Sequence, residues 1–233
     1  KTAYAMLRSL VGSEMCIRDS PYAMRARMAL YLAEIKCEIR EIRLSNKPEQ
    51  MLEVSPKGTV PILILEDKVI DESYDIVNWV IEQSNIFNDN LESDQIDLTE
   101  SLIKKFDDEF KHHLDRYKYA TRYENTDSDF HRAECLKILV DLEATASNDK
   151  WIFGENLNKL DISILPFIRQ FRIANPEWFD SLEEISRIKK ILNNYLDSEE
   201  FKKIMFKYDE WELGAKPVYF PCLLYTSPSP RDS

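Results

Sequence analysis

The chain is poor in glycine, cysteine and histidine, and its acidic residues outnumber its basic ones. It has 4 Gly, 4 Cys and 3 His among 233 residues, and its formal net charge is −11. With so few glycines there is no glycine-rich loop to hold a phosphate, which argues against nucleotide-dependent chemistry. Because binding to nucleic acid requires a basic patch, a chain this acidic is not expected to bind DNA or RNA.

Long hydrophobic runs are also missing. No apolar stretch approaches the roughly 18 residues that a membrane-spanning helix needs, so we expect no membrane association. Hydrophobic residues make up 44% of the chain and charged residues 31%. This composition is typical of a water-soluble protein that buries a core in one or two domains.

The cysteines and histidines form no recognisable metal or disulfide pattern. Two cysteines lie near the ends, and the spacing of Cys37 and Cys135 fits neither a disulfide framework nor a zinc site. His112 and His113 would point about 100° apart on a helix, so they cannot chelate one ion as an i, i+4 pair could. The third histidine is His131. We therefore predict no metal site, and a reducing compartment such as the cytoplasm.

Residues 20–83 alternate between helical and strand periodicity, which predicts a small mixed α/β domain. The predicted elements are a helix over 21–35, a strand over 38–44, a helix over 47–53, a hairpin of 60–65 with 68–70, and a helix over 73–83. This order is that of a thioredoxin-like layer that lacks its first strand.

Beyond a polar linker over 84–95, the sequence predicts only helices. They cover 96–117, 129–147, 159–173, 182–196 and 199–206. The third of them begins with Asn158 followed by Asp161, the spacing of a capping box. We expect this pair to act in folding rather than in catalysis.

The most informative stretch is 55–63 (SPKGTVPIL), followed at the head of the next helix by Glu72 and Ser73. A cis bond before Pro61 would turn the Val60 N–H and C=O outward, where an extended peptide could pair with them. Ser73 and the first amides of the helix could hold a carboxylate while Glu72 faces an ammonium. Together they would bind a small peptide with a free amino acid end, and we predict glutathione. In the alternative, Pro61 only begins an edge strand and Ser73 only caps its helix.

Several motifs resemble those of glutathione transferases. Residues 20–27 (SPYAMRAR) resemble the Cys-Pro-Tyr/Phe helix start of cysteine-type members such as the omega class, and 46–48 (NKP) match the segment after their second strand. Residues 110–117 (FKHHLDRY) and 161–171 resemble the helical second domain of bacterial members. The resemblance covers about 20–221. It implies a thioredoxin-like N-terminal domain, an all-helical C-terminal domain and a homodimer.

The resemblance also implies roles at the matching positions. Lys47 would pair with the glycyl carboxylate of glutathione, Val60 and Pro61 would hold the cysteinyl backbone, and Glu72 and Ser73 would bind the γ-glutamyl end. The implied activity is transfer of a thiol, or conjugation of glutathione to a small electrophile. The alternative is a catalytically silent transferase-like module that binds a protein partner, as certain bacterial regulators resembling this family do.

Both ends of the chain resemble translated sequencing adaptors. Residues 9–20 (SLVGSEMCIRDS) and 222–232 (CLLYTSPSPRD) look like transposon-type adaptor sequence read as protein, and 1–4 (KTAY) looks like a flow-cell primer in the same frame. We therefore expect the natural fragment to be 20–221. The expected divisions are an adaptor-like segment 1–19, a glutathione-binding domain 20–83, a linker 84–95, a helical domain 96–221 and an adaptor-like tail 222–233.

In that case the first strand of the family's sheet is lost. Because this strand lies inside the sheet, the adaptor-like segment must replace it or leave ladder groups unpaired. Leu10, Val11, Met15 and Ile17 are the residues expected to fill part of its place.

Ser20 is the candidate catalytic residue, at the position where the cysteine-type members have cysteine. Such an adaptor fills only part of codon 20, so serine here would be a junction product. A thiol at a helix N-terminus is stabilised as thiolate by the helix dipole. A serine hydroxyl could at most donate a hydrogen bond to the glutathione sulfur, so the chain as written could be inactive. Alternatively Ser20 is an ordinary N-cap before Pro21.

A second-substrate pocket is suggested by Arg116, Tyr117 and Tyr119, which could supply aromatic walls with a few polar groups. The same residues could equally pack at the domain interface with their hydroxyls at the surface.

Overall fold

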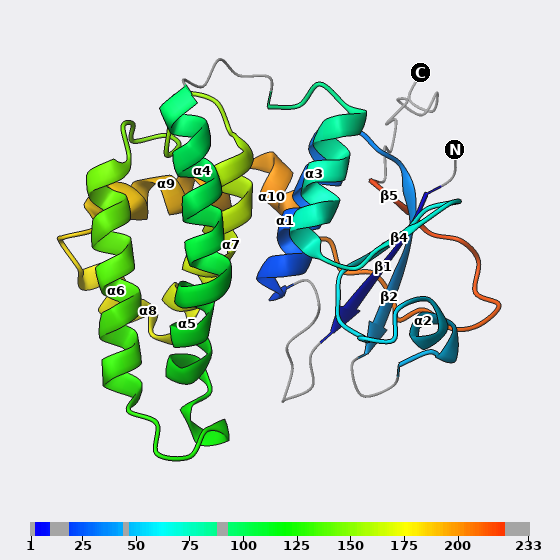
Figure 1. Cartoon of the computed structure of the whole chain (residues 1–233), viewed down its shortest axis with the longest axis horizontal. Coiled ribbons are helices and arrows are strands. Elements are labelled where there is room, and N and C mark those ends of the chain that lie inside the picture. Colours follow the sequence, from blue (N-terminus) through cyan, green and yellow to red (C-terminus); the bar gives the residue numbers. More distant parts are fainter. Residues whose placement is uncertain (1–2, 10–18, 44–46, 88–92, 222–233) are drawn as a thin grey trace, which may run out of the picture.

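A computed structural model describes residues 3–9, 19–43, 47–87 and 93–221. Within them a small β-sheet lies beside a bundle of helices (Figure 1). Helices α1 (Pro21–Leu32) and α3 (Ser73–Gln83) stand between the sheet and the bundle, and α2 (Glu49–Val54) lies on the other side of the sheet. This is the predicted architecture, a thioredoxin-like domain followed by a helical domain.

The sheet has five strands in the order β4-β3-β1-β2-β5. They are β1 (Ala3–Ser9), β2 (Cys37–Arg43), β3 (Ile62–Ile64), β4 (Val69–Ile70) and β5 (Tyr219–Phe220). β1 is parallel to β2 and antiparallel to β3, while β5 runs antiparallel to β2 along its outer side. The predicted hairpin is present as β3 and β4, although its strands are shorter than expected.

The central position of the sheet is filled by Ala3–Ser9, which pairs with all seven residues of β2. Residues 10–17, which the sequence analysis had suggested for this position, lie outside the described residues. A segment that lies between β2 and β3 can form backbone hydrogen bonds with both of these strands. This accounts for the strand formed by Ala3–Ser9, whose sequence has no helix signal.

Helix α1 is the most enclosed element of the first domain, with nine of its twelve residues buried. It starts at Pro21, whose missing N–H is no loss in the first turn, and ends three residues earlier than predicted. The chain turns there at Glu34, which has φ of 53°. Because α1 packs against α3 and also against α7 (Lys159–Ala174), its arginines are buried with it.

The helical domain departs from prediction in two places. The helix predicted over 96–117 is α4 (Ser93–Lys105), a π-helical turn (Phe106–Phe110) and α5 (Lys111–Lys118) in direct succession. A short helix that was not predicted, α8 (Pro176–Ser181), precedes α9 (Ser186–Asp197). The remaining helices are α6 (Ser128–Thr145) and α10 (Glu199–Ile204).

Among the described helices, none combines the length and apolar character needed to cross a bilayer.

The capping box at the start of α7 is confirmed. The Asn158 side chain accepts hydrogen bonds from the N–H groups of Leu160 (2.8 Å) and Asp161 (3.3 Å). The Asp161 carboxylate accepts in return from the N–H of Asn158 (3.0 Å) and from that of Ile152 (3.0 Å). Asp161 is fully buried, so it satisfies two amides that water cannot reach.

Asp161→Ala should therefore lower the free energy of unfolding by several kcal/mol, since each buried amide left without an acceptor costs about 1–3 kcal/mol. The control is Asp127→Ala at α6, where the carboxylate caps two exposed amides and its loss should cost about 1 kcal/mol. Urea unfolding of both variants measures the difference. Equal destabilisation by the two substitutions would contradict this role for Asp161.

Candidate functional site

Three segments of the first domain are joined by side-chain contacts: the start of α1, the loop before β3, and the start of α3. Arg25, on the second turn of α1, donates from Nε to the Ser73 hydroxyl at 2.9 Å. Lys57, in the loop, donates from Nζ to Glu72 at 3.0 Å. The predicted residues at 72 and 73 therefore lie close to both of the other segments.

The loop brings Val60 to the end of a paired strand. The Val60-Pro61 peptide bond is cis, and Pro61 is buried. β3 begins at the next residue, Ile62, which pairs with Met6 of β1. Among the described residues, neither the N–H nor the C=O of Val60 has a hydrogen-bond partner. A half-buried backbone in this state can accept an extended peptide as an added strand.

Glu72 stands at the N-cap position of α3 with its side chain 61% exposed. Its partner Lys57 is 55% exposed and also contacts Asp71 at 3.4 Å. The hydrogen bonds that Lys57 donates to Glu72 and then to Asp71 raise its pKa above the usual value. Exposed ion pairs contribute little to stability, so the ammonium of a ligand can take the place of Lys57. Lys57 and Asp71 belong to the stretch that the sequence analysis singled out, but it assigned neither a role, since their contact depends on the turn that brings them together.

Ser73 is buried at the first turn of α3. Its hydroxyl oxygen accepts from Arg25, which leaves the hydroxyl proton available to a second acceptor. The first intrahelical bond of α3 runs from the Ile76 N–H to the Glu72 carbonyl (3.0 Å). The amides before Ile76 are thus free of helical partners, as at any helix start, and favour an anion.

The helical domain fixes Arg25. Its guanidinium is 3% exposed and binds both carboxylate oxygens of Asp107, which lies in the π-helical turn, at 2.8–3.0 Å. The rings of Tyr22, Tyr74 and Phe167 lie 5.3–5.8 Å from its central carbon. Burial raises the pKa of the Asp107 carboxyl, and the charge of Arg25 opposes that rise. The sequence analysis included Arg25 in a motif but gave it no role.

Ser20 occupies the N-cap position of α1 without acting as a cap through its side chain. Its carbonyl accepts from the Met24 N–H at 2.9 Å, while its half-buried hydroxyl makes no capping hydrogen bond. The preceding residue, Asp19, is held by α7: Gln170 donates to its carbonyl and Arg169 to its carboxylate. The Ser20 hydroxyl is therefore available to hydrogen-bond a ligand at the positive end of the α1 dipole.

Burial shifts the pKa of two side chains near this site, Tyr22 and Lys118. Burial raises the pKa of Tyr22 far above its usual value, and its ring packs edge-on against Phe167 at 5.2 Å. Tyr22 therefore keeps its phenolic proton and serves in packing. Burial, and then the charge of Arg169, lower the pKa of Lys118, whose amine donates to Gln170.

Lys47 lies exposed in the chain just before α2. Its neighbour Asn46 is outside the described residues. The described contacts do not join Lys47 to Val60, Glu72 or Ser73.

The three residues suggested for a second-substrate pocket face different neighbours. The Arg116 guanidinium lies 4.6 Å from the Tyr123 ring centre. Tyr117 packs on Phe171 of α7, with ring centres 5.5 Å apart. Tyr119 lies under Arg122 at 4.2 Å and beside the Lys118 amine at 5.4 Å. Of the three, Tyr119 is next to the Lys118–Gln170 pair that reaches Asp19, whereas Tyr117 packs inside the helical domain.

The described residues contain no group of three or more His, Cys, Asp or Glu side chains arranged to hold a metal ion. His113 and His131 are neighbours in space, with their Nδ1 atoms 2.8 Å apart. This pairing of α5 with α6 was not predicted from the sequence.

Comparison with known proteins identifies the family of this chain. The family described as "Glutathione S-transferase, N-terminal domain" matches residues 16–87. "Probable glutathione S-transferase parA" of Nicotiana tabacum is 30% identical over 158 residues, which cover 65% of this chain and 69% of that protein. An alignment of this length extends beyond the region that the family model matches and into the helical domain, so the class of protein is that of the glutathione S-transferases.

Two solved structures have the same fold. The Tau class enzyme MiGSTU of mango, Mangifera indica, has a TM-score of 0.70 at 23% identity, covering 88% of this chain and 93% of its own. A glutathione transferase family member of Pseudomonas fluorescens, with two glutathione bound, has a TM-score of 0.71 at 15% identity, covering 87% and 92%. The chain belongs to the glutathione S-transferase family.

Asp107→Asn should destabilise the protein by about 3 kcal/mol, because it leaves the buried charge of Arg25 without its counter-charge. The matched control is Asp180→Asn, which removes an equally well-formed Arg–Asp pair with Arg172 at the surface. That change should cost less than about 1 kcal/mol. Urea unfolding of the full chain compares them. Equal losses of stability in the two variants would show that the buried Arg25–Asp107 pair contributes no more than the surface pair.

Proposed function

We propose that this protein binds glutathione at the junction of α1, the loop before β3 and α3, and transfers it to a small electrophilic or disulfide substrate. The observation that carries the proposal is the Arg25 contact to Ser73, which ties the turn after Ser20 to the amide-rich start of α3. If the γ-glutamyl group of glutathione is anchored at the start of α3, the rest of the tripeptide lies between α3 and Ser20.

Each end of glutathione has a complementary group in this scheme. The γ-glutamyl carboxylate accepts from the Ser73 hydroxyl and the first amides of α3, and its ammonium takes the place of Lys57 on Glu72. The cysteinyl backbone pairs with Val60, whose N–H and C=O have no partner among the described residues. Lys47 serves the glycyl carboxylate. The Pseudomonas fluorescens neighbour, which holds glutathione, has the same fold.

The residue at position 20 decides the chemistry. As serine, its hydroxyl donates a hydrogen bond that stabilises the glutathione thiolate, which attacks an electrophilic carbon and expels its leaving group as an anion. As cysteine, its thiolate would attack a glutathione mixed disulfide and release the substrate thiol. A second glutathione thiolate would then free the enzyme and leave as glutathione disulfide. The thiolate is favoured by the dipole of α1.

The wider setting follows from family membership. We propose a homodimer that works in the cytoplasm in the detoxification of reactive small molecules. The alternative is a silent module of the same fold that binds a protein partner, and the two experiments below separate it from an enzyme.

Glu72→Ala should weaken glutathione binding at least tenfold, since it removes the carboxylate that faces the ligand ammonium. Isothermal titration with reduced glutathione measures the change, and the control is Glu82→Ala, an exposed acid at the other end of α3. If the parent chain binds no glutathione, or if both variants bind it as the parent does, this site is not the glutathione site.

Ser20→Cys should gain glutathione-dependent reduction of 2-hydroxyethyl disulfide, and Ser20→Ala should lose conjugation to 1-chloro-2,4-dinitrobenzene. A thiol can form the mixed disulfide that a hydroxyl cannot, and alanine removes the hydrogen bond to the thiolate. Steady-state assays of the three proteins test both statements. Glutathione binding without turnover of either substrate by any of the three would favour the silent module.

A further inference from the structure

The three histidines of the chain meet at one place on the surface of the helical domain. His112 and His113 lie on the first turn of α5, and His131 lies on the first turn of α6. The centres of their rings are 5.0–5.9 Å apart. Figure 1 shows the two helices side by side, joined by the chain at their lower ends. Every imidazole group of the protein therefore belongs to a single cluster.

Two of the three rings face each other through their nitrogen atoms. The Nδ1 atoms of His113 and His131 are 2.8 Å apart. Because a neutral imidazole has one N–H and one bare nitrogen, one Nδ1 donates and the other accepts. The Nδ1 of His112 is engaged elsewhere, since it accepts from the Arg116 guanidinium at 3.0 Å. The facing pair thus consists of one histidine from each helix.

The distance between the two Nδ1 atoms is that of two neighbouring ligands on one metal ion. An imidazole nitrogen binds a transition metal at about 2.0–2.1 Å, so two of them at a right angle are about 2.9 Å apart and two at the tetrahedral angle about 3.4 Å apart. The observed 2.8 Å agrees with the right angle. Right-angled positions are typical of Cu²⁺ and Ni²⁺, and both ions bind imidazole well.

The fold holds the two rings in this position. On one side of the pair, the Ser128 hydroxyl donates to the Tyr117 carbonyl at 3.4 Å. On the other side, the Cys135 thiol donates to the Phe110 carbonyl at 3.7 Å. The Phe130 ring stands beside both imidazoles, with ring centres 6.0 and 5.2 Å away. Because α5 and α6 are fixed to each other above and below the pair, an ion that binds there has little to order.

The prediction that the chain has no metal site considered His112 and His113 on a single helix. Those two cannot chelate one ion, but the partner of His113 is 18 residues further along the chain, on another helix. The described residues supply no third ligand. Both rings of the pair are half-buried, so water can reach the ion and fill its remaining positions.

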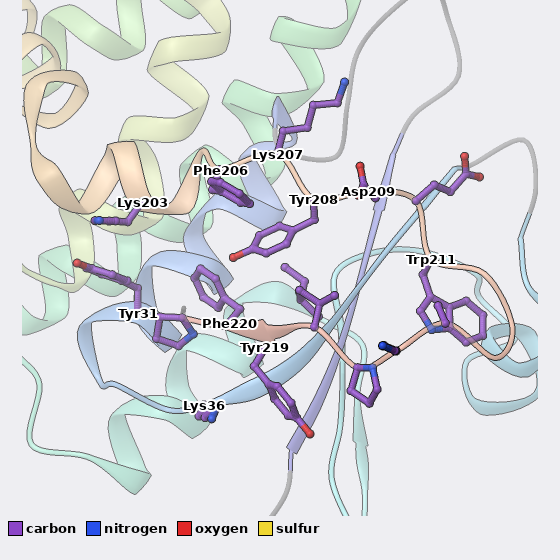
Figure 2. A pocket seen from close by; sticks show the side chains of 17 residues that line it. Tyr31, Lys36, Lys203, Phe206, Lys207, Tyr208, Asp209, Trp211, Tyr219 and Phe220 are labelled. Atoms are coloured by element: carbon purple, nitrogen blue, oxygen red, sulfur yellow. The ribbon is translucent and has the colours of Figure 1, made fainter. Parts of the chain in front are cut away.

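The cleft shown in Figure 2 offers no competing site of this kind. It lies beside the last turn of α1 and has a volume of about 1120 Å³. The described residues that line it include no histidine or cysteine, and their only carboxylates are those of Asp209 and Glu210, among the four lysines at 36, 203, 207 and 216. Carboxylates surrounded by ammonium groups are poor ligands for an ion that prefers imidazole.

We propose that His113 and His131 bind one divalent transition metal ion of the nickel or copper type through their Nδ1 atoms, with water in its other positions. The proton that one Nδ1 carries in the metal-free pair moves through water to Nε2 of the same ring, so both rings stay neutral and each gives one lone pair. The ion joins α5 to α6 and stabilises the folded chain. The pair takes no part in glutathione transfer, so this site is independent of the proposed function.

The test is isothermal titration of the full chain with NiCl2, without a polyhistidine tag and without glutathione, in a non-chelating buffer at neutral pH. Nickel is the probe because thiols do not reduce it. One ion should bind per chain, and saturating Ni²⁺ should raise the midpoint of thermal unfolding, whereas Mg²⁺, which prefers oxygen ligands, should not. Absence of saturable binding up to about 1 mM Ni²⁺, or an equal shift with Mg²⁺, would overturn the proposal.

Three variants locate the ion. His113→Gln and His131→Gln should each weaken Ni²⁺ binding at least tenfold, because one imidazole alone cannot chelate. The control is His112→Gln, which removes the adjacent ring and should keep the affinity within twofold. Circular dichroism checks the fold of each variant, and the thermal shift of the parent chain tests metal binding without any substitution. Binding that persists in both pair variants, or that falls equally in the control, would place the ion elsewhere.

Discussion

The site depends on one buried charge. Arg25 is enclosed within α1, donates three hydrogen bonds to Asp107 of the helical domain, and donates a fourth to Ser73. Burial of a guanidinium costs free energy unless its N–H donors are matched by acceptors. The positions of Asp107 and Ser73, which both accept from Arg25, are therefore constrained by each other. The start of α3 is thereby held against the helical domain as well as against its own sheet. The proposed glutathione-binding face is therefore a property of both domains, although its predicted residues all come from the first.

The parts of the fold that the sequence predicted are those with local signals. Helix α3 has the predicted bounds Ser73–Gln83, because its apolar spacing and its acidic start lie within one segment. The capping box of Asn158 and Asp161 lies within four residues and is present as predicted. The short helix α8 was missed although Asn175-Pro176 is a good local start, with the Asn175 side chain accepting from the Trp178 N–H.

What the sequence could not predict depends on distant partners. Arg25 and Asp107 are 82 residues apart, and no periodicity within either helix indicates that they meet. β5 is two residues long and exists only because β2 offers it a ladder. The directions of Arg116, Tyr117 and Tyr119 depend on the π-helical turn ahead of α5, which shifts the phase of every later residue on the helix. A sequence pattern that assumes an uninterrupted helix assigns those faces wrongly.

The two outer strands of the sheet have a consequence for how copies of this protein can associate. β4 and β5 contain only two residues each, and β5 shields part of β2 from the side. Short border strands offer too few free backbone groups to template the sheet of another molecule. Continuation of the sheet from one copy into the next is thus disfavoured at both borders. Contact between copies is left to helices and side chains, where it can form and separate without disturbing the backbone of the proposed tripeptide site.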